Sequence, residues 1–131
     1  MGYQPILIKT LENNNMLYNL SVLELMGSAD AFFIHKLVHM FIDSTIPELA
    51  ELNEAHQNRD LVKIASVAHS MKSNIEIFSV DSMKQTIRIL ENKGTLPTLS
   101  DNILASHVEE VNTIIQNVMA EMLKDYPLNS D

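Results

Sequence analysis

The stretch "AHSMKS", residues 68–73, places a histidine and a lysine three residues apart inside an otherwise apolar run. An imidazole can accept and release a covalently bound group near neutral pH, because one ring nitrogen then carries a free lone pair. On a helix, Lys72 lies one turn from His69, so its ammonium can screen negative charge held on the ring. These residue types and this spacing suit covalent chemistry at His69 with a negatively charged group, such as a phosphoryl group.

A helix must position this histidine, and the apolar residues around it have helical spacing. Asp60 is a suitable N-cap for that helix, and the expected buried stripe is Leu61, Ile64, Ala65, Ala68, Met71, Ile75 and Phe78. At 100° per residue, His69 lies about 110° from the centre of the stripe. We therefore expect an exposed ring, with Ser66, Ser73 and Glu76 beside it. The competing interpretation is an ordinary surface histidine.

The next helix supplies the expected partners of the histidine. We expect Asp81 to cap it and Gly94 to end it, with Lys84, Arg88 and Glu91 on one exposed stripe. If this helix packs against that of His69, the Glu91 carboxylate can bind Nδ1 and leave Nε2 free as the nucleophile. The alternative is that Glu91 is an ordinary solvated residue.

The remaining helices complete the expected fold. "SVLE" at 21–24 has the form of a capping box, opening a short helix that Gly27 can close. A long helix follows within 29–58, capped by Ser28 or Asp30, which Pro47 should kink or split. A last helix starts at Ser100 or Asp101 and extends to about Lys124. The sequence predicts an all-α protein: an antiparallel four-helix bundle with an accessory N-terminal helix, forming one domain over 1–131 with its core at about 21–124.

Composition and charge narrow the possible partners. The 131 residues carry a net charge of −8, which disfavours nucleic acid and anionic membranes. Residues 59–93 hold six basic and four acidic side chains, a net of +2, which suits an anionic ligand or an acidic partner. Cysteine is absent, no apolar run is long enough to span a membrane, and the first residues do not resemble a signal peptide, so we expect a cytoplasmic protein.

The segment "AHSMKSNIEIFSV", residues 68–80, resembles the signature of the histidine-containing phosphotransfer (HPt) domains of two-component phosphorelays. Ala68, His69, Lys72 and Ser73 match it, and Met71 stands where the family has leucine. The resemblance extends upstream through "YNLSVLELMGSADAFFIHKLVHMFIDSTIPELAEL". It also includes "ILEN" at 89–92, where the family has a Leu-Glu or a glutamine that binds the histidine ring. Glycine is common in the family at positions 73 and 79; serine is a frequent variant at 73, whereas Ser79 departs from the family pattern.

The resemblance implies a phosphorelay intermediate. His69 Nε2 would accept a phosphoryl group from the aspartate of a response-regulator receiver domain and pass it to another receiver. A hybrid histidine kinase is a further candidate partner. Mg²⁺ would be supplied by the receiver, with no cofactor in this chain. The sequence has no Gly-rich phosphate loop, so we expect a carrier protein without kinase activity of its own.

Two competing interpretations remain. His35 and His39, four residues apart, could provide two metal ligands on one helix face, but the sequence offers no evident third ligand, so we expect no metal site. The second is a related helical scaffold that binds a receiver or a kinase without carrying phosphate. The presence of His69, Lys72 and Glu91 together favours phosphotransfer.

Overall fold

The computed structural model describes residues 17–21, 23 and 30–127. These residues contain four α-helices: α3 (Ala31–Gln57), α4 (Leu61–Ile77), α5 (Lys84–Leu90) and α6 (Asp101–Asp125). Two short 3₁₀ helices, η1 (Asp81–Met83) and η2 (Leu96–Thr98), stand before and after α5. Since the described residues include no strand, the predicted all-α class is confirmed.

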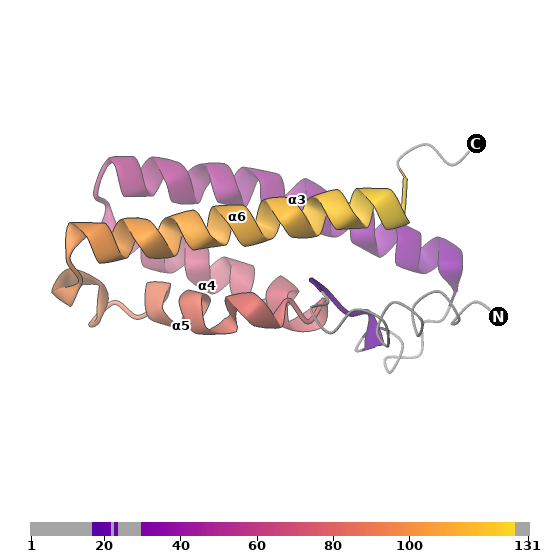
Figure 1. The fold of residues 1–131 in the computed structure, drawn as a ribbon, viewed down its shortest axis with the longest axis horizontal. Helices are drawn as coiled ribbons and strands as arrows, with labels where there is room; N and C mark the ends of the chain where they lie inside the picture. Colours follow the sequence, from indigo (N-terminus) through magenta and orange to yellow (C-terminus); the bar gives the residue numbers. More distant parts are fainter. Residues whose placement is uncertain (1–16, 22, 24–29, 128–131) are drawn as a thin grey trace.

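The four helices pack around one apolar core. In Figure 1, α3 and α6 run along one side of the molecule, with α4 and α5 along the other. The main contacts join α3 to α4 and α6, and join α5 to the same two helices. The most completely buried large side chains come from every helix and from the leading segment: Leu20, Leu52, Ile64, Met71, Ile75, Met83, Leu90, Leu96, Ile115 and Met122. This arrangement buries the apolar stripes that the sequence predicts.

Three helix starts are capped by the residues that the sequence indicates. The side chains of Asp30, Asp60 and Ser100 accept hydrogen bonds from backbone N–H groups in the first turns of α3, α4 and α6. Ser28 and most of the expected accessory helix at 21–27 lie outside the described residues.

Pro47 does not split the long helix. Helix α3 continues through it from Ala31 to Gln57, so the expected split is wrong, while the alternative of a kink stays a prediction. Both Pro47 and Asp43, whose carbonyl loses its usual helical partner, are exposed, and water can solvate that carbonyl. Burial of Ile42 and Leu49 on the opposite face holds the helix together across the proline.

The expected ends of the fourth helix were also wrong. Asp81 begins the 3₁₀ turn η1 and makes an ion pair with Lys84 (3.2 Å), while no side chain caps α5. Helix α5 ends at Leu90, four residues before Gly94. The cause is Asn92, whose side-chain oxygen accepts hydrogen bonds from the backbone N–H groups of Gly94 and Thr95 and so turns the chain.

Two hydrogen bonds attach the described leading residues to the bundle. The backbone N–H of Asn19 donates to the carbonyl of Phe78 at 2.8 Å, and the Tyr18 hydroxyl donates to Asp125 Oδ2 at 2.6 Å. Burial, followed by this hydrogen bond, raises the pKa of Tyr18 well above its usual range. The hydroxyl therefore stays protonated and remains a donor.

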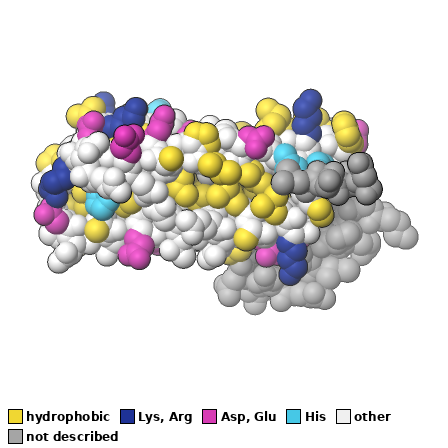
Figure 2. All heavy atoms as spheres, turned by 90° about the horizontal axis from the view of Figure 1, so that it is seen from above, with side chains coloured by type: hydrophobic (Ala, Val, Ile, Leu, Met, Phe, Trp, Pro, Cys, Tyr) yellow, Lys and Arg dark blue, Asp and Glu magenta, His cyan; other side chains and the backbone are white. Residues whose placement is uncertain are grey.

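The face that carries α3 and α6 is partly apolar. Figure 2, which views the molecule from above, shows a band of hydrophobic side chains between scattered charged ones. Exposed apolar residues of these two helices include Met40, Ile46 and Leu123. None of the helices in the described ranges has the length and apolar character needed to cross a bilayer.

Candidate functional site

His69 lies near the middle of α4 and points away from the core. Its neighbours Ala68 and Met71 are buried, with relative exposures of 0% and 2%, and they fix the rotation of the helix. The His69 side chain is 77% exposed. The predicted outward position of this ring is confirmed, so a second protein can reach it.

Helix α5 places Glu91 against the ring. Glu91 follows the last helical residue, and the burial of Ile87 and Leu90 presses this helix end against the bundle. Glu91 Oε1 lies 3.0 Å from His69 Nδ1. Because an ionised carboxylate can only accept, Nδ1 carries the proton and donates it, and the lone pair is left on Nε2.

The same carboxylate also binds Lys72. Lys72 Nζ lies 3.1 Å from Glu91 Oε2, so each oxygen holds a different side chain of α4. The hydrogen bond from His69, followed by that from Lys72, lowers the pKa of Glu91 against the opposing effect of desolvation. Glu91 is 17% exposed. At neutral pH it is therefore an anion held in a fixed place by two donors.

This arrangement is suited to nucleophilic chemistry. The exposed nitrogen has a fixed tautomer, the carboxylate can neutralise positive charge on the ring, and a flexible ammonium lies one turn away. Within the ranges that the structure describes, no group of three or more His, Cys, Asp or Glu side chains could hold a metal ion.

Comparison with protein-family models identifies the chain. The model described as the Hpt domain matches residues 36–124, which is more than half of the sequence and includes His69, Lys72 and Glu91. The chain belongs to the Hpt domain family. Searches of curated proteins and of solved structures gave no match. Hpt domains are histidine phosphotransfer carriers of two-component phosphorelays and not kinases, and they work with receiver domains and kinases.

The other predicted site residues of this Hpt domain lie on its exposed surface. Ser73 and Glu76 are on α4, and Lys84 and Arg88 are on α5. Glu76 is seven residues from His69, which places both on the same side of the helix. Val62, seven residues before His69, shares this side and is 68% exposed. Of the predicted site residues, Glu91 contacts both His69 and Lys72. The expected roles of Ser73, Glu76, Lys84 and Arg88 in binding the phosphoryl group and the partner stay predictions.

The positive charge of residues 59–93 is partly neutralised by ion pairs. Besides Lys72, Lys84 pairs with Asp81, and Arg59 pairs with Asp101 of α6 at 2.6 Å. Among the described residues, three of the six basic side chains of this segment thus have acidic partners. Glu91 and Asp81 are already counted in the net charge of +2, so only Asp101, which pairs with Arg59, brings negative charge from outside the segment.

His35 and His39 of this Hpt domain make contacts with each other and with the end of α6. Their ring centroids are 4.5 Å apart, and His39 Nε2 donates to the carbonyl of Tyr126 at 2.8 Å. Because His39 Nε2 carries a proton and donates it to this carbonyl, it has no free lone pair with which to bind a metal ion. These contacts support the interpretation of the two histidines as packing residues.

Sequence reasoning did not anticipate the hydrogen bonds of Ser70, the residue after His69. Its hydroxyl lies 2.8 Å from the carbonyl of Val67 and 3.1 Å from Glu48 Oε2. Burial raises the pKa of Glu48, and the hydrogen bond from Ser70 opposes that effect. Glu48 and Ser70 are 22 residues apart, and their local sequence carries no sign of this contact between α3 and α4.

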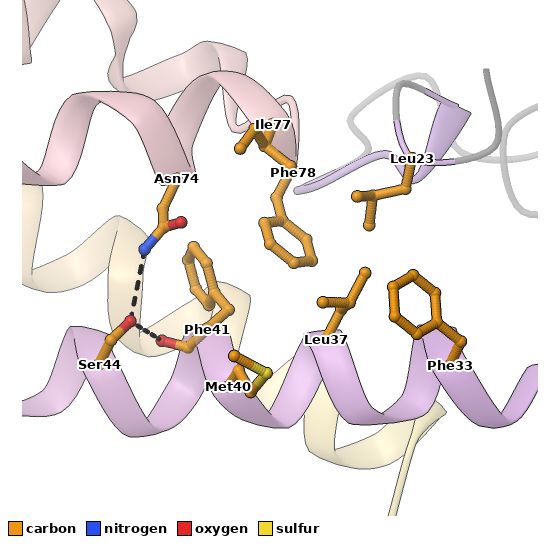
Figure 3. A pocket seen from close by; sticks show the side chains of 9 residues that line it. All are labelled: Leu23, Phe33, Leu37, Met40, Phe41, Ser44, Asn74, Ile77 and Phe78. Carbon is orange, nitrogen blue, oxygen red and sulfur yellow. Dashed lines mark hydrogen bonds between the residues drawn. The ribbon is translucent and has the colours of Figure 1, made fainter. Parts of the chain in front are cut away.

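A pocket between α3 and α4 was also missed. Figure 3 shows side chains from both helices, from Phe78 and from Leu23 converging on it. Its polar edge is Asn74, which donates to the Ser44 hydroxyl at 3.3 Å, and the rest of the lining is apolar: Leu23, Phe33, Leu37, Met40, Phe41, Ile77 and Phe78. One sequence signal could have predicted this pocket. Apolar residues recur at helical spacing along one face of α3, at Phe33, Leu37 and Met40, outside the stripe that is buried in the core.

Proposed function

We propose that this chain is a phosphorelay intermediate that accepts a phosphoryl group on His69 Nε2 from a receiver-domain aspartate and passes it to another receiver. The observation that carries the proposal is the exposed His69 ring, whose Nδ1–H is held by Glu91 at 3.0 Å. This geometry leaves the unprotonated nitrogen at the accessible edge. The chain's membership of the Hpt family supports the same reaction.

In the proposed step, the Nε2 lone pair attacks the phosphorus of an aspartyl phosphate. A P–N bond forms, the bond between phosphorus and the aspartyl oxygen breaks, and the receiver's carboxylate leaves with the electron pair. While Nδ1 keeps its proton, the phosphorylated ring is a cation, and Glu91 is placed to stabilise it. The reverse sequence on a second receiver completes the relay, so neither direction needs a nucleotide or a redox partner.

Positioning and charge screening are the main demands of phosphoryl transfer. In the proposal, Lys72 screens the phosphoryl group, and the exposed Ser73, Glu76, Lys84 and Arg88 contribute to partner binding. The receiver supplies Mg²⁺, and this chain needs no cofactor. The proposed unit is a single domain over 1–131 whose consecutive helices run antiparallel, as short connections between bundle helices favour.

The experiment is phosphotransfer from a phosphorylated receiver domain to the purified chain. We expect acid-labile, base-stable phosphate on the wild type, none on His69→Gln, and wild-type labelling of the control His56→Gln at the end of α3. Labelling of His69→Gln would place the phosphoryl group elsewhere. Binding of the receiver without transfer to the wild type would refute the relay and favour the scaffold.

A further inference from the structure

Lys72 and His69 depend on one carboxylate. Glu91 Oε2 is 3.1 Å from Lys72 Nζ, and Glu91 Oε1 is 3.0 Å from His69 Nδ1. The ammonium is thus paired on the Nδ1 side of the ring, whereas the proposed phosphoryl group is attached at Nε2. In this structure Lys72 is engaged with Glu91, so a direct bond from its ammonium to a phosphoryl group on Nε2 would require the side chain to move.

The burial of the Lys72 and Glu91 side chains differs in a way that permits such a change. The Lys72 side chain is 46% exposed, whereas Glu91 is only 17% exposed and lies at the end of α5 beside buried Leu90. An ammonium on a four-carbon stem moves easily at a surface. The carboxylate is therefore the fixed member of the cluster, and Lys72 is the mobile one.

Charge favours the change once the ring is phosphorylated. Glu91 offers one negative charge, already shared with Nδ1–H, whereas a phosphoryl group carries about −1.5 to −2 and three strong acceptor oxygens. Lys72 lies one helical turn from His69, within reach of either edge of the ring. The more highly charged acceptor competes for the ammonium, while Nδ1–H keeps its bond to Glu91.

We propose that Lys72 is a switching residue: it pairs with Glu91 in the unphosphorylated domain and moves to the phosphoryl group when His69 is phosphorylated. This inference rests on the proposed function. The exchange leaves the full carboxylate charge facing the cationic phosphorylated ring. It also moves a positive charge from the Nδ1 edge to the Nε2 edge, so a receiver meets a different surface in each state.

The test is an NMR comparison of four samples: wild type and Glu91→Gln, each before and after phosphorylation with phosphoramidate. In that reaction Nε2 forms the P–N bond and ammonia leaves, so no partner protein is required. Glutamine retains an oxygen that accepts from Nδ1–H but lacks the negative charge that holds Lys72. The readout is the side-chain ¹³Cε and ¹⁵Nζ signals of Lys72. Lys63, nine residues earlier and about 13 Å along the helix, serves as the control.

We expect the Lys72 chemical shifts of wild type and Glu91→Gln to differ before phosphorylation. After phosphorylation this difference should become several-fold smaller, and the Lys63 shifts should stay unchanged throughout. A difference between wild type and Glu91→Gln that persists after phosphorylation would overturn the exchange, even though phosphate on His69 would uphold this histidine as the accepting residue. If the variant takes no phosphate, the wild type decides alone: an unmoved Lys72 signal refutes the exchange, and a shift well above that of Lys63 supports it. Failure of the wild type to accept phosphate would refute the exchange, because it would remove the phosphohistidine on which the exchange depends, whereas the relay itself is tested by transfer from a receiver.

Discussion

His69 Nδ1 lies 3.0 Å from Glu91 Oε1, although the two residues are 22 positions apart in the chain. The contact exists because α4 and α5 pack together, with Ala68 and Met71 on one helix and Leu90 on the other buried in the shared core. The orientation of the histidine ring therefore depends on tertiary packing. Four predictions follow from this cluster and its surroundings.

Glu91→Ala should impair phosphotransfer, because it removes the acceptor that fixes the Nδ1–H tautomer. A hydrogen bond to a charged group contributes about 1.5–3 kcal/mol, so we expect transfer to slow by about 10- to 100-fold. Glu91→Gln, which keeps an accepting oxygen, should lose less. ¹⁵N NMR of the ring should show the proton on Nδ1 in the wild type and a mixture of tautomers in Glu91→Ala. The same tautomer in both proteins would contradict the positioning role.

Lys72→Ala should leave the bundle folded and slow transfer by about tenfold, because a cation that screens the transferred group is lost. Lys63→Ala is the matched control, because Lys63 is also an exposed lysine of α4 but lies outside the cluster. Stopped-flow transfer from a phosphorylated receiver measures the rate, and circular dichroism verifies the fold. Equal rates for the two variants would remove Lys72 from the mechanism.

Ser79→Gly should stabilise the protein. Ser79 has a φ of 53°, in the left-handed region, which costs a non-glycine residue about 1–2 kcal/mol. Glycine removes this strain but adds conformational entropy to the unfolded chain, so the expected net gain is about 0.5–1 kcal/mol. Ser73→Gly, in the interior of α4, should instead destabilise by about 0.5 kcal/mol. Chemical denaturation measures both changes, and a loss of stability in Ser79→Gly would contradict the strain argument.

The contacts of Glu91 should make stability depend on acid pH. The hydrogen bond from His69, and then that from Lys72, lowers the pKa of Glu91 in the folded state. The resulting stabilisation is present above the unfolded-state value of about 4.3 and is lost as the pH falls through the lower folded-state value. Denaturation of wild type and Glu91→Gln from pH 5 downward should show the difference in unfolding free energy closing below about pH 4. A difference that stays constant to pH 2 would exclude this linkage.

Local sequence patterns predict most of the helical elements of this protein and the exposure of His69. The spacing of apolar residues defined α3, α4 and α6, Asp60 and Ser100 marked two helix starts, and the position of His69 relative to its stripe predicted an exposed ring. These features are local. They follow from helical geometry and from side chains that bond to the nearest backbone groups.

Other features depend on contacts between residues distant in the chain, so only the folded structure reveals them. Helix α3 accommodates Pro47 because the Asp43 carbonyl, which loses its helical partner, faces solvent, while burial of the opposite face holds the helix together. After α5, the Asn92 side chain turns the chain before it reaches Gly94. The left-handed backbone of Ser79, a conformation that favours glycine, is also visible only in the folded chain. The packing of α5 on α4 likewise decided that Lys72 and His69 share Glu91, since no local pattern specifies which oxygen each of them meets.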